Sequence, residues 1–189
     1  MKQSRLLLAA VLLLVAGVVQ AQGVRPFFSM ALTGGGDNLL TIVSGSGSDD
    51  ISAGGLLSMS FGAKLPMADP NLEGRVSFGY FFDIQSYSNG DASFDRFPLE
   101  SLLMYRSGQM FWLGGGITYH INPTLSCNIT AVCSGDISFD NALGVILQTD
   151  WLVTNSILVG LRYTSIEYDG PLGSTADGSH IGLIGTFLY

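Results

Sequence analysis

Residues 179–189 read SHIGLIGTFLY, and two kinds of side chain alternate along this stretch up to its final aromatic residue. Ile181, Leu183, Phe187 and Tyr189 occupy one set of alternate positions. Because successive side chains of a β-strand point to opposite faces, these four residues share one apolar face. The other face carries a more polar set, consisting of His180, Gly182, Ile184 and Thr186. The pattern predicts a β-strand with an apolar outer side and a polar inner side.

Seven earlier stretches repeat this two-residue period, and segments rich in turn-forming residues separate them. The eight expected strands are residues 26–33, 52–65, 72–84, 94–105, 109–121, 141–151, 156–168 and 179–189. Their lengths suit tilted spans of a membrane, which take about 9–11 residues. On their outer faces near the strand ends we expect interfacial aromatic rings from Tyr105, Tyr119, Trp151, Tyr163 and Tyr189.

The connections between the expected strands alternate in length. Residues 66–71, 106–108 and 152–155 form short connections, whereas 34–51, 85–93, 122–140 and 169–178 form longer ones. A soluble β-sandwich has no reason to alternate in this way, but bacterial membrane barrels have short turns on one side and long loops on the other. The sequence therefore predicts an all-β fold, an eight-stranded antiparallel up-and-down transmembrane β-barrel. Within the first loop, Ser44-Gly45-Ser46-Gly47 suits the turn of an additional hairpin.

The first 21 residues have the pattern of a secretory signal peptide. Lys2 and Arg5 precede an apolar run at 6–19, and small residues at Val19 and Ala21 suit cleavage after Ala21. We expect residues 1–21 to be the signal peptide and 22–189 to be one outer-membrane barrel domain. The run is short for a transmembrane anchor, which is the alternative interpretation.

The chain is acidic, with a formal net charge of −7, and Lys2 and Arg5 both fall in the expected signal peptide. This charge gives no electrostatic basis for binding nucleic acid. Cys127 and Cys133 are the only cysteines, and an exported protein favours a disulfide between them. A metal site would need further ligands nearby, so we expect no metal and no cofactor.

The inner faces of the expected strands define a lumen. An eight-stranded barrel is only wide enough to be filled by side chains, and buried charges need partners. We therefore expect a filled polar lumen containing a hydrogen-bonded network of Lys64, Arg75, Glu100 and Arg162. The remaining inner-face residues are Ser58, Ser60, Gly62, Ser77, Gly79, Asp83, Trp112, Thr118, His120, Gln148, Asp150, Thr164, His180 and Thr186.

The chain resembles the bacterial outer-membrane β-barrel domain family, the small eight-stranded OmpA-like and OmpX-like proteins. The resemblance lies in LRYTSIEY at 161–168, DGSH at 177–180 with the terminal strand, and Gly34-Gly35-Gly36-Asp37. Family members commonly end in Phe, whereas this chain ends in Tyr189. The resemblance implies a location in the bacterial outer membrane, contact with its lipid and lipopolysaccharide, and assembly by the barrel-assembly machinery, which reads the last strand. It implies no single biochemical function.

Three functions are compatible with this pattern. We favour a non-enzymatic protein with a structural or surface-interaction role through its external loops, whose extracellular partner the sequence does not name. A lipid A-modifying barrel enzyme is one alternative, with His180, Ser179 and Glu167 as its best candidate residues, although no deacylase-like His-Ser motif is present. A narrow porin-like channel or transporter of small molecules is the other alternative.

Overall fold

The computed structural model describes residues 23–44, 47–87, 90–130 and 133–189. The expected signal peptide at 1–21 and its cleavage after Ala21 lie outside these residues. The middle of the expected turn at 45–46 also lies outside them. Among the described residues, no helix is long and apolar enough to cross a membrane.

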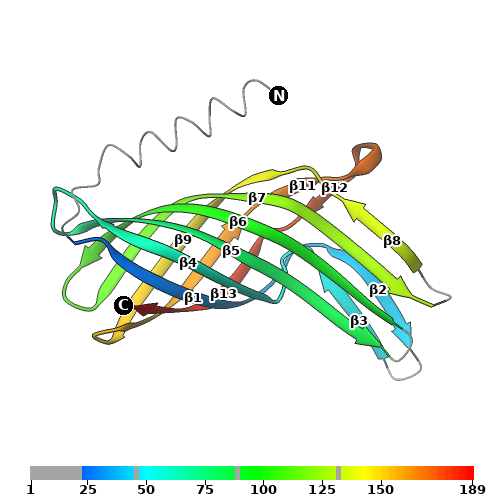
Figure 1. The fold of residues 1–189 in the computed structure, drawn as a ribbon, viewed down its shortest axis with the longest axis horizontal. Helices are drawn as coiled ribbons and strands as arrows, with labels where there is room; N and C mark the ends of the chain where they lie inside the picture. The colour runs from blue at the N-terminus through cyan, green and yellow to red at the C-terminus, as the bar shows by residue number, and fades with distance from the viewer. Residues whose placement is uncertain (1–22, 45–46, 88–89, 131–132) are drawn as a thin grey trace.

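Eight long strands form a closed ring in which every neighbouring pair is antiparallel, as Figure 1 shows. Around the ring they are β1 Arg25–Gly34, β4 Leu57–Pro66, β5 Leu72–Tyr87, β6 Gly90–Ser107, β7 Phe111–Ile129, β9 Ala142–Thr154, β10 Ile157–Ser165 and β13 His180–Leu188. The last strand, β13, closes the ring against β1, with Phe28 opposite Phe187. The predicted fold class, an eight-stranded antiparallel barrel, is confirmed.

The two ends of the barrel differ. The turn end carries the short connections at 67–71, 108–110 and 155–156 together with the start of β1 and the end of β13. The opposite loop end carries shorter elements, which are β2 Asn38–Ser44, β3 Gly47–Ser52, β8 Cys133–Ser138, β11 Glu167–Asp169, the 3-10 helix η1 Pro171–Gly173 and β12 Thr175–Asp177. β2 pairs with β3, β8 with β7, and β11 with β12. The predicted hairpin in the first loop is therefore confirmed.

Two sequence-based boundaries are wrong at the loop end. The segment 122–140 is not an irregular loop, because β7 continues to Ile129 and β8 then pairs back on it. The continuation of β7 places Leu125 opposite Phe94 and Cys127 opposite Ala92, and all four side chains are buried. Burial of these apolar groups favours strand pairing beyond the expected span. In the same way β5 and β6 extend through most of the connection expected at 85–93.

The expected strand at 52–65 is also wrong at its start, because β4 begins only at Leu57. Residues 53–55 instead form a buried turn at the barrel mouth. Gly55 has a φ of +68°, and a Cβ added there would lie 2.8 Å from the Nη2 atom of Arg96. Glycine thus permits both the left-handed turn and the close approach of the chain to the lumen.

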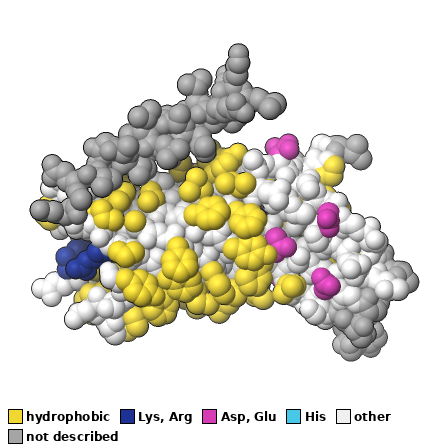
Figure 2. All heavy atoms as spheres, viewed as in Figure 1, with side chains coloured by type: hydrophobic (Ala, Val, Ile, Leu, Met, Phe, Trp, Pro, Cys, Tyr) yellow, Lys and Arg dark blue, Asp and Glu magenta, His cyan; other side chains and the backbone are white. Residues whose placement is uncertain are grey.

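The outer surface of the ring is apolar over the middle of the barrel, as Figure 2 shows for one face. Along β9, Leu143, Val145, Leu147 and Trp151 are exposed, whereas the intervening residues are mostly buried. A contiguous apolar surface of this kind is rare on soluble monomers but is the expected lipid-facing surface of a membrane barrel. Tyr105, Tyr163 and Tyr189 are exposed on the same surface.

The lumen is filled by apolar as well as polar side chains, which differs from the expectation of a polar lumen. One apolar cluster consists of Leu102, Met104, Trp112, Ile146 and Leu158. A larger cluster at the loop end consists of Ile51, Ala53, Ala92, Phe94, Leu125, Cys127, Ile129, Ala142, Ile166 and Tyr168. The inward segment at 51–55 and the extended parts of β6 and β7 supply much of this second cluster, and neither was expected from the sequence.

Candidate functional site: the charged lumen and its loop end

A chain of ion pairs begins where β4 and β5 face each other across the register pair Lys64 and Arg75. Lys64 Nζ lies 2.8 Å from Glu73 Oε2, and Arg75 Nε donates to Glu73 Oε1 at 2.7 Å. Arg75 also pairs with Asp150 of β9 across the lumen. Glu73 thus bridges two cations. It lies two residues before Arg75 on β5, so both side chains point to the same face.

The chain continues from Asp150 to the other two expected network residues. Gln148 Nε2 donates to Asp150 Oδ1 at 2.9 Å, and Gln148 Oε1 accepts from Arg162 Nε at 2.8 Å. Arg162 Nη1 then contacts both carboxylate oxygens of Glu100, at 2.8 and 2.9 Å. The structure therefore places Lys64, Arg75, Glu100 and Arg162 in one connected chain, with Glu73, Asp150 and Gln148 as intermediates.

In this chain of ion pairs, the positive charges are matched by an equal number of carboxylates. Lys64, Arg75 and Arg162 are matched by Glu73, Asp150 and Glu100, and all of these side chains are largely buried. Removing ions from water is costly, and close pairing with hydrogen bonds offsets that cost. This chain of ion pairs links five strands across the lumen. Its chemistry is that of a structural network rather than of a reactive centre.

Arg96 of β6 is a charged lumen residue that the sequence reasoning missed. Its side chain is 0% exposed, and its guanidinium lies against aromatic rings, 3.8 Å from the Phe81 centroid and 4.7 Å from that of Phe94. The Tyr168 ring centroid is 5.8 Å away. Glu100 lies four residues later on the same strand, so side-chain alternation places Arg96 on the inner face as well. The sequence pattern could therefore have identified Arg96 as a lumen residue.

The two histidines lie close to Arg96 at the loop end, and both are buried. The Nδ1 atom of His120 lies 2.6 Å from the Tyr168 hydroxyl. His180 Nδ1 lies 2.8 Å from the carbonyl oxygen of Gly178. The Phe81 ring packs edge-on between them, with ring centroids 6.3 Å from His120 and 5.1 Å from His180.

The structure does not bring the candidate catalytic residues together. Ser179 Oγ accepts from the backbone N–H of Ile166 at 3.3 Å, and the Glu167 side chain is exposed. His180 makes its bond to Gly178 instead. A nucleophile needs its base within hydrogen-bond reach, which this arrangement does not supply.

Tyr168 lies on β11, beyond the spanning ring, in the apolar cluster of the loop end. Burial raises the pKa of Tyr168 to about 12, against the opposing effect of the positive charge of Arg96. The phenol is therefore neutral at physiological pH and is available as a hydrogen-bond partner for His120.

A small cavity lies between this chain of ion pairs and the loop end. Its volume is about 20 Å³, and its lining includes Phe81, Glu100, His120, Arg162 and His180. A space of this size holds about one water molecule. The buried clusters and this small cavity show that side chains fill this part of the lumen.

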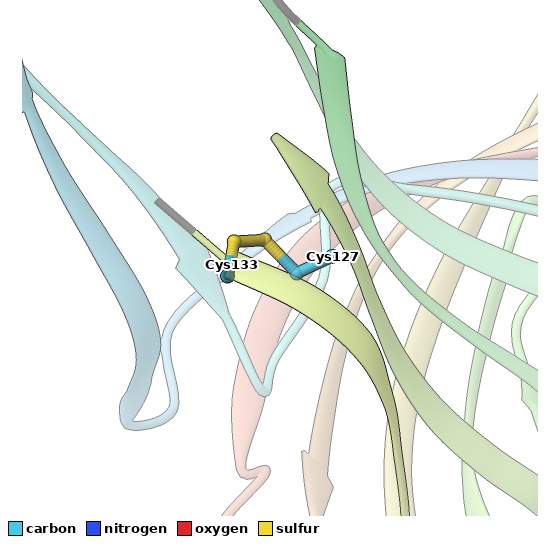
Figure 3. The surroundings of a disulfide bond; sticks show 2 residues. All are labelled: Cys127 and Cys133. Carbon is cyan, nitrogen blue, oxygen red and sulfur yellow. A yellow bond between two sulfur atoms is a disulfide. The ribbon is translucent and has the colours of Figure 1, made fainter. Parts of the chain in front are cut away.

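The loop end carries the two cysteines. Cys127 on β7 and Cys133 on β8 form a disulfide, which Figure 3 shows across the β7–β8 hairpin. Cys127 belongs to the buried cluster, whereas most of β8 is exposed. The disulfide thus ties an exposed hairpin to the closed mouth of the barrel.

Charge is distributed unevenly between the two ends. The exposed acidic residues at the loop end are Asp37, Asp50, Asp91, Asp136, Asp140, Glu167, Asp169 and Asp177. Among the described residues, the exposed basic side chains are Arg25 and Arg106, and both lie at the turn end. In Figure 2 the acidic side chains lie toward the loop end and the basic ones at the turn end.

No protein-family model and no curated protein sequence matches this chain. Among solved structures, Neisserial surface protein A (NspA) matches with a TM-score of 0.52 at 13% identity over 89% of this chain and 98% of that one. Ail, the attachment invasion locus protein of Yersinia pestis, matches with a TM-score of 0.56 at 9% identity over 88% of this chain and 97% of that one. That structure is a complex with the heparin analogue sucrose octasulfate.

Both neighbours are small eight-stranded outer-membrane β-barrels. At these identities the likeness concerns the fold, and it agrees with the closed ring of β1, β4, β5, β6, β7, β9, β10 and β13. The chain therefore has the fold of the small eight-stranded outer-membrane barrels, and the resemblance seen in the sequence is confirmed at that level.

Proposed function

We propose that this chain is a protein of the bacterial outer membrane that acts through the surface of its loop end and not through its lumen. The observation that carries the proposal is the apolar outer band, which lies between an acidic loop end and a turn end with basic residues. Lipid and lipopolysaccharide cover the band, and the loop end faces outward from the cell. The packed lumen supports a structural role for the interior and weighs against a channel.

The charge of the loop end supports a positively charged partner outside the cell. Eight exposed carboxylates surround the mouth, and the basic residue there, Arg96, is buried. Complementary charge steers association, whereas like charge suppresses it. A heparin-like polyanion, such as the analogue bound in the Ail structure, is therefore a poor partner for this surface.

We also propose a partner for the assembly of the barrel in the membrane. The barrel-assembly machinery engages β13, whose apolar face ends at Phe187 and the exposed Tyr189. Since β13 pairs with β1 to close the ring, its recognition would couple insertion to closure.

The membrane orientation can be tested with peptide tags. A tag inserted after Gly173, which lies in the exposed loop between β11 and β12, should bind antibody on intact cells. The matched tag after Gly108, in the turn between β6 and β7, should bind only after the outer membrane is permeabilised. The reverse pattern, or labelling of both tags on intact cells, would contradict the proposed orientation.

The charge preference can be tested on the refolded barrel in detergent. Oligolysine should bind with an affinity that falls steeply with salt, and heparin should not bind. Replacing Asp136, Asp140, Asp169 and Asp177 together by Asn should weaken oligolysine binding, whereas Arg106→Gln at the turn end should leave it unchanged. Heparin binding to the unmodified barrel would contradict the proposal that the loop end binds positively charged partners.

A further inference from the structure

The segment 166–178, which contains the hairpin of β11 and β12 and which we call the cap, is a separate element of the loop end. In the described sheets, β11 pairs only with β12, and neither strand forms a ladder with a ring strand. An isolated two-stranded hairpin is marginally stable, so the position of the cap depends on its packing. Its buried side chains are Ile166, Tyr168 and Ala176.

Two buried histidines bond to the cap. The Nδ1 atom of His120 on β7 lies 2.6 Å from the Tyr168 hydroxyl, in the first strand of the cap. His180 of β13 donates from Nδ1 to the carbonyl oxygen of Gly178, the last residue of the cap, at 2.8 Å. Both ends of the cap are therefore bonded to imidazoles, whose charge changes near neutral pH in water.

The cations that face both imidazoles are Arg96 of β6 and Arg162 of β10. Arg96 is fully buried, and its Nε, Nη1 and Nη2 atoms have no hydrogen-bond partner among the described residues. The Tyr168 ring of the cap lies against both groups, with its centroid 5.8 Å from the Arg96 guanidinium and 5.9 Å from the His120 ring. The cap thus covers a region that already holds an unpaired positive charge.

The carboxylates on the surrounding elements do not offset a further positive charge. Glu100 lines the small cavity together with both imidazoles, but its two oxygens bond to Arg162. The others are Asp83, Asp95 and Asp177, and each accepts a hydrogen bond from another group. A proton on either imidazole would therefore bury a second charge beside Arg96 without a carboxylate bonded to it, which costs free energy.

We propose that the cap opens when the pH falls, because His120 and His180 take up protons only where water reaches them. The closed state keeps both imidazoles uncharged, so they favour closure above about pH 6.5, and this contribution is lost as the pH falls below that value. Each histidine shifts the opening equilibrium about 30-fold between about pH 7.5 and about pH 5. Opening gives water access to Arg96 and to the apolar cluster under Tyr168.

Hydrogen exchange of the refolded barrel in detergent tests the opening directly. Mass spectrometry at about pH 7.5 and about pH 5 compares the protection of each segment after correction for the intrinsic pH dependence of amide exchange. Residues 166–178 should lose protection by at least about 30-fold at the lower pH, whereas the ring strands should keep theirs. Unchanged protection of the cap, or an equal loss throughout the ring, would overturn the proposal.

Variants separate the histidines from the carboxylates. The double variant His120→Gln with His180→Gln contains no imidazole, since the chain has two histidines. Its cap should be equally protected at both pH values. Arg96→Met keeps both imidazoles and should reduce the pH effect, whereas Arg106→Met, the same substitution at an exposed site, should behave as the wild type. A loss of protection in the double variant as large as in the wild type would contradict the assignment to the histidines.

A measurement on the wild type decides if the variants do not fold. With isotope-labelled histidine, NMR follows the protonation of both imidazole rings as the pH is lowered. The rings should take up protons over the same pH interval in which residues 166–178 lose protection. Protonated rings beneath a cap that is still protected would overturn the coupling.

Discussion

Arg162 and Arg96 show two ways in which this lumen accommodates a cation. Arg162 contacts both oxygens of Glu100 and the amide oxygen of Gln148, so its charge and its donors are both matched. Arg96 has aromatic neighbours and no bonded acceptor among the described residues. The stability of the barrel should therefore depend on Arg162 through its carboxylate partner, Glu100.

Removing Glu100 should expose the cost of an unpaired lumen cation. Glu100→Leu leaves Arg162 without its carboxylate and should destabilise the barrel by about 3–5 kcal/mol, whereas the double variant with Arg162→Leu should recover most of the loss. Urea unfolding followed by tryptophan fluorescence measures all four members of the cycle. Additive losses would show that the two side chains do not act as a pair.

Charge on the outer band should be poorly tolerated. Phe78 and Val159 are exposed on the ring, and Arg at either position should cost roughly 2–4 kcal/mol in a bilayer. The matched control is Ile137→Arg, because Ile137 is equally apolar and exposed but lies on β8 outside the ring. Folding yields in lipid vesicles compare the variants. If Phe78→Arg folded as well as Ile137→Arg, the lipid-facing assignment would be wrong.

Tyr168 should make the barrel sensitive to alkali. Its pKa is about 12 in the folded protein and 10.0 ordinarily, so the folded state retains the proton longer than the unfolded state. Its contribution is fully present below pH 10 and is lost as the pH rises toward 12, by roughly 3 kcal/mol in total. Tyr168→Phe should show a shallower decline of stability over this window. An identical pH profile for the variant would contradict the assignment.

At the scale of elements, the spanning strands and the hairpin of the first loop could be predicted from the sequence, but the loop end could not. Alternation identified the spanning parts of the ring strands because each has one apolar and one more polar face. It failed at 122–140, where Asn122, with a φ of 54°, and Pro123 interrupt the pattern although β7 continues. Pairing there depends on side chains distant in sequence, such as Phe94 opposite Leu125.

The lumen network was predictable in its members but not in its connections. Alternation placed Lys64, Arg75, Glu100 and Arg162 inside, yet it does not state which side chains meet across the barrel. Arg75 reaches Asp150, which is 75 residues away in sequence, and this contact follows from ring closure. Glu73 and Arg96 share the same alternation and could have been included by extending it along β5 and β6.

The disulfide hairpin should be separable from the barrel. The Cys127–Cys133 bond connects β7 to β8, and β8 is not one of the eight ring strands. Reduction should speed hydrogen exchange in residues 133–138 and leave the folded barrel band on a gel unchanged. The double variant Cys127→Ser with Cys133→Ser should show no response to reductant. Loss of the folded band on reduction would show that the ring itself depends on the disulfide.

At the scale of the whole molecule, closure of the ring leaves none of its eight strands at a free edge of the spanning part, so the backbone there is satisfied within the sheet, which a bilayer requires. A band of apolar side chains then faces outward, most charged side chains in the lumen are paired, and the exposed acidic side chains gather mainly at the loop end.

Heat-modifiability tests this account most directly. The protein refolded in detergent micelles or lipid vesicles should migrate at one position on an SDS gel when unheated and at another after boiling, because a closed barrel resists SDS until heated. In cells, the unheated form should be found in the outer-membrane fraction. Identical migration before and after boiling, together with recovery in the soluble fraction, would contradict a membrane-spanning barrel.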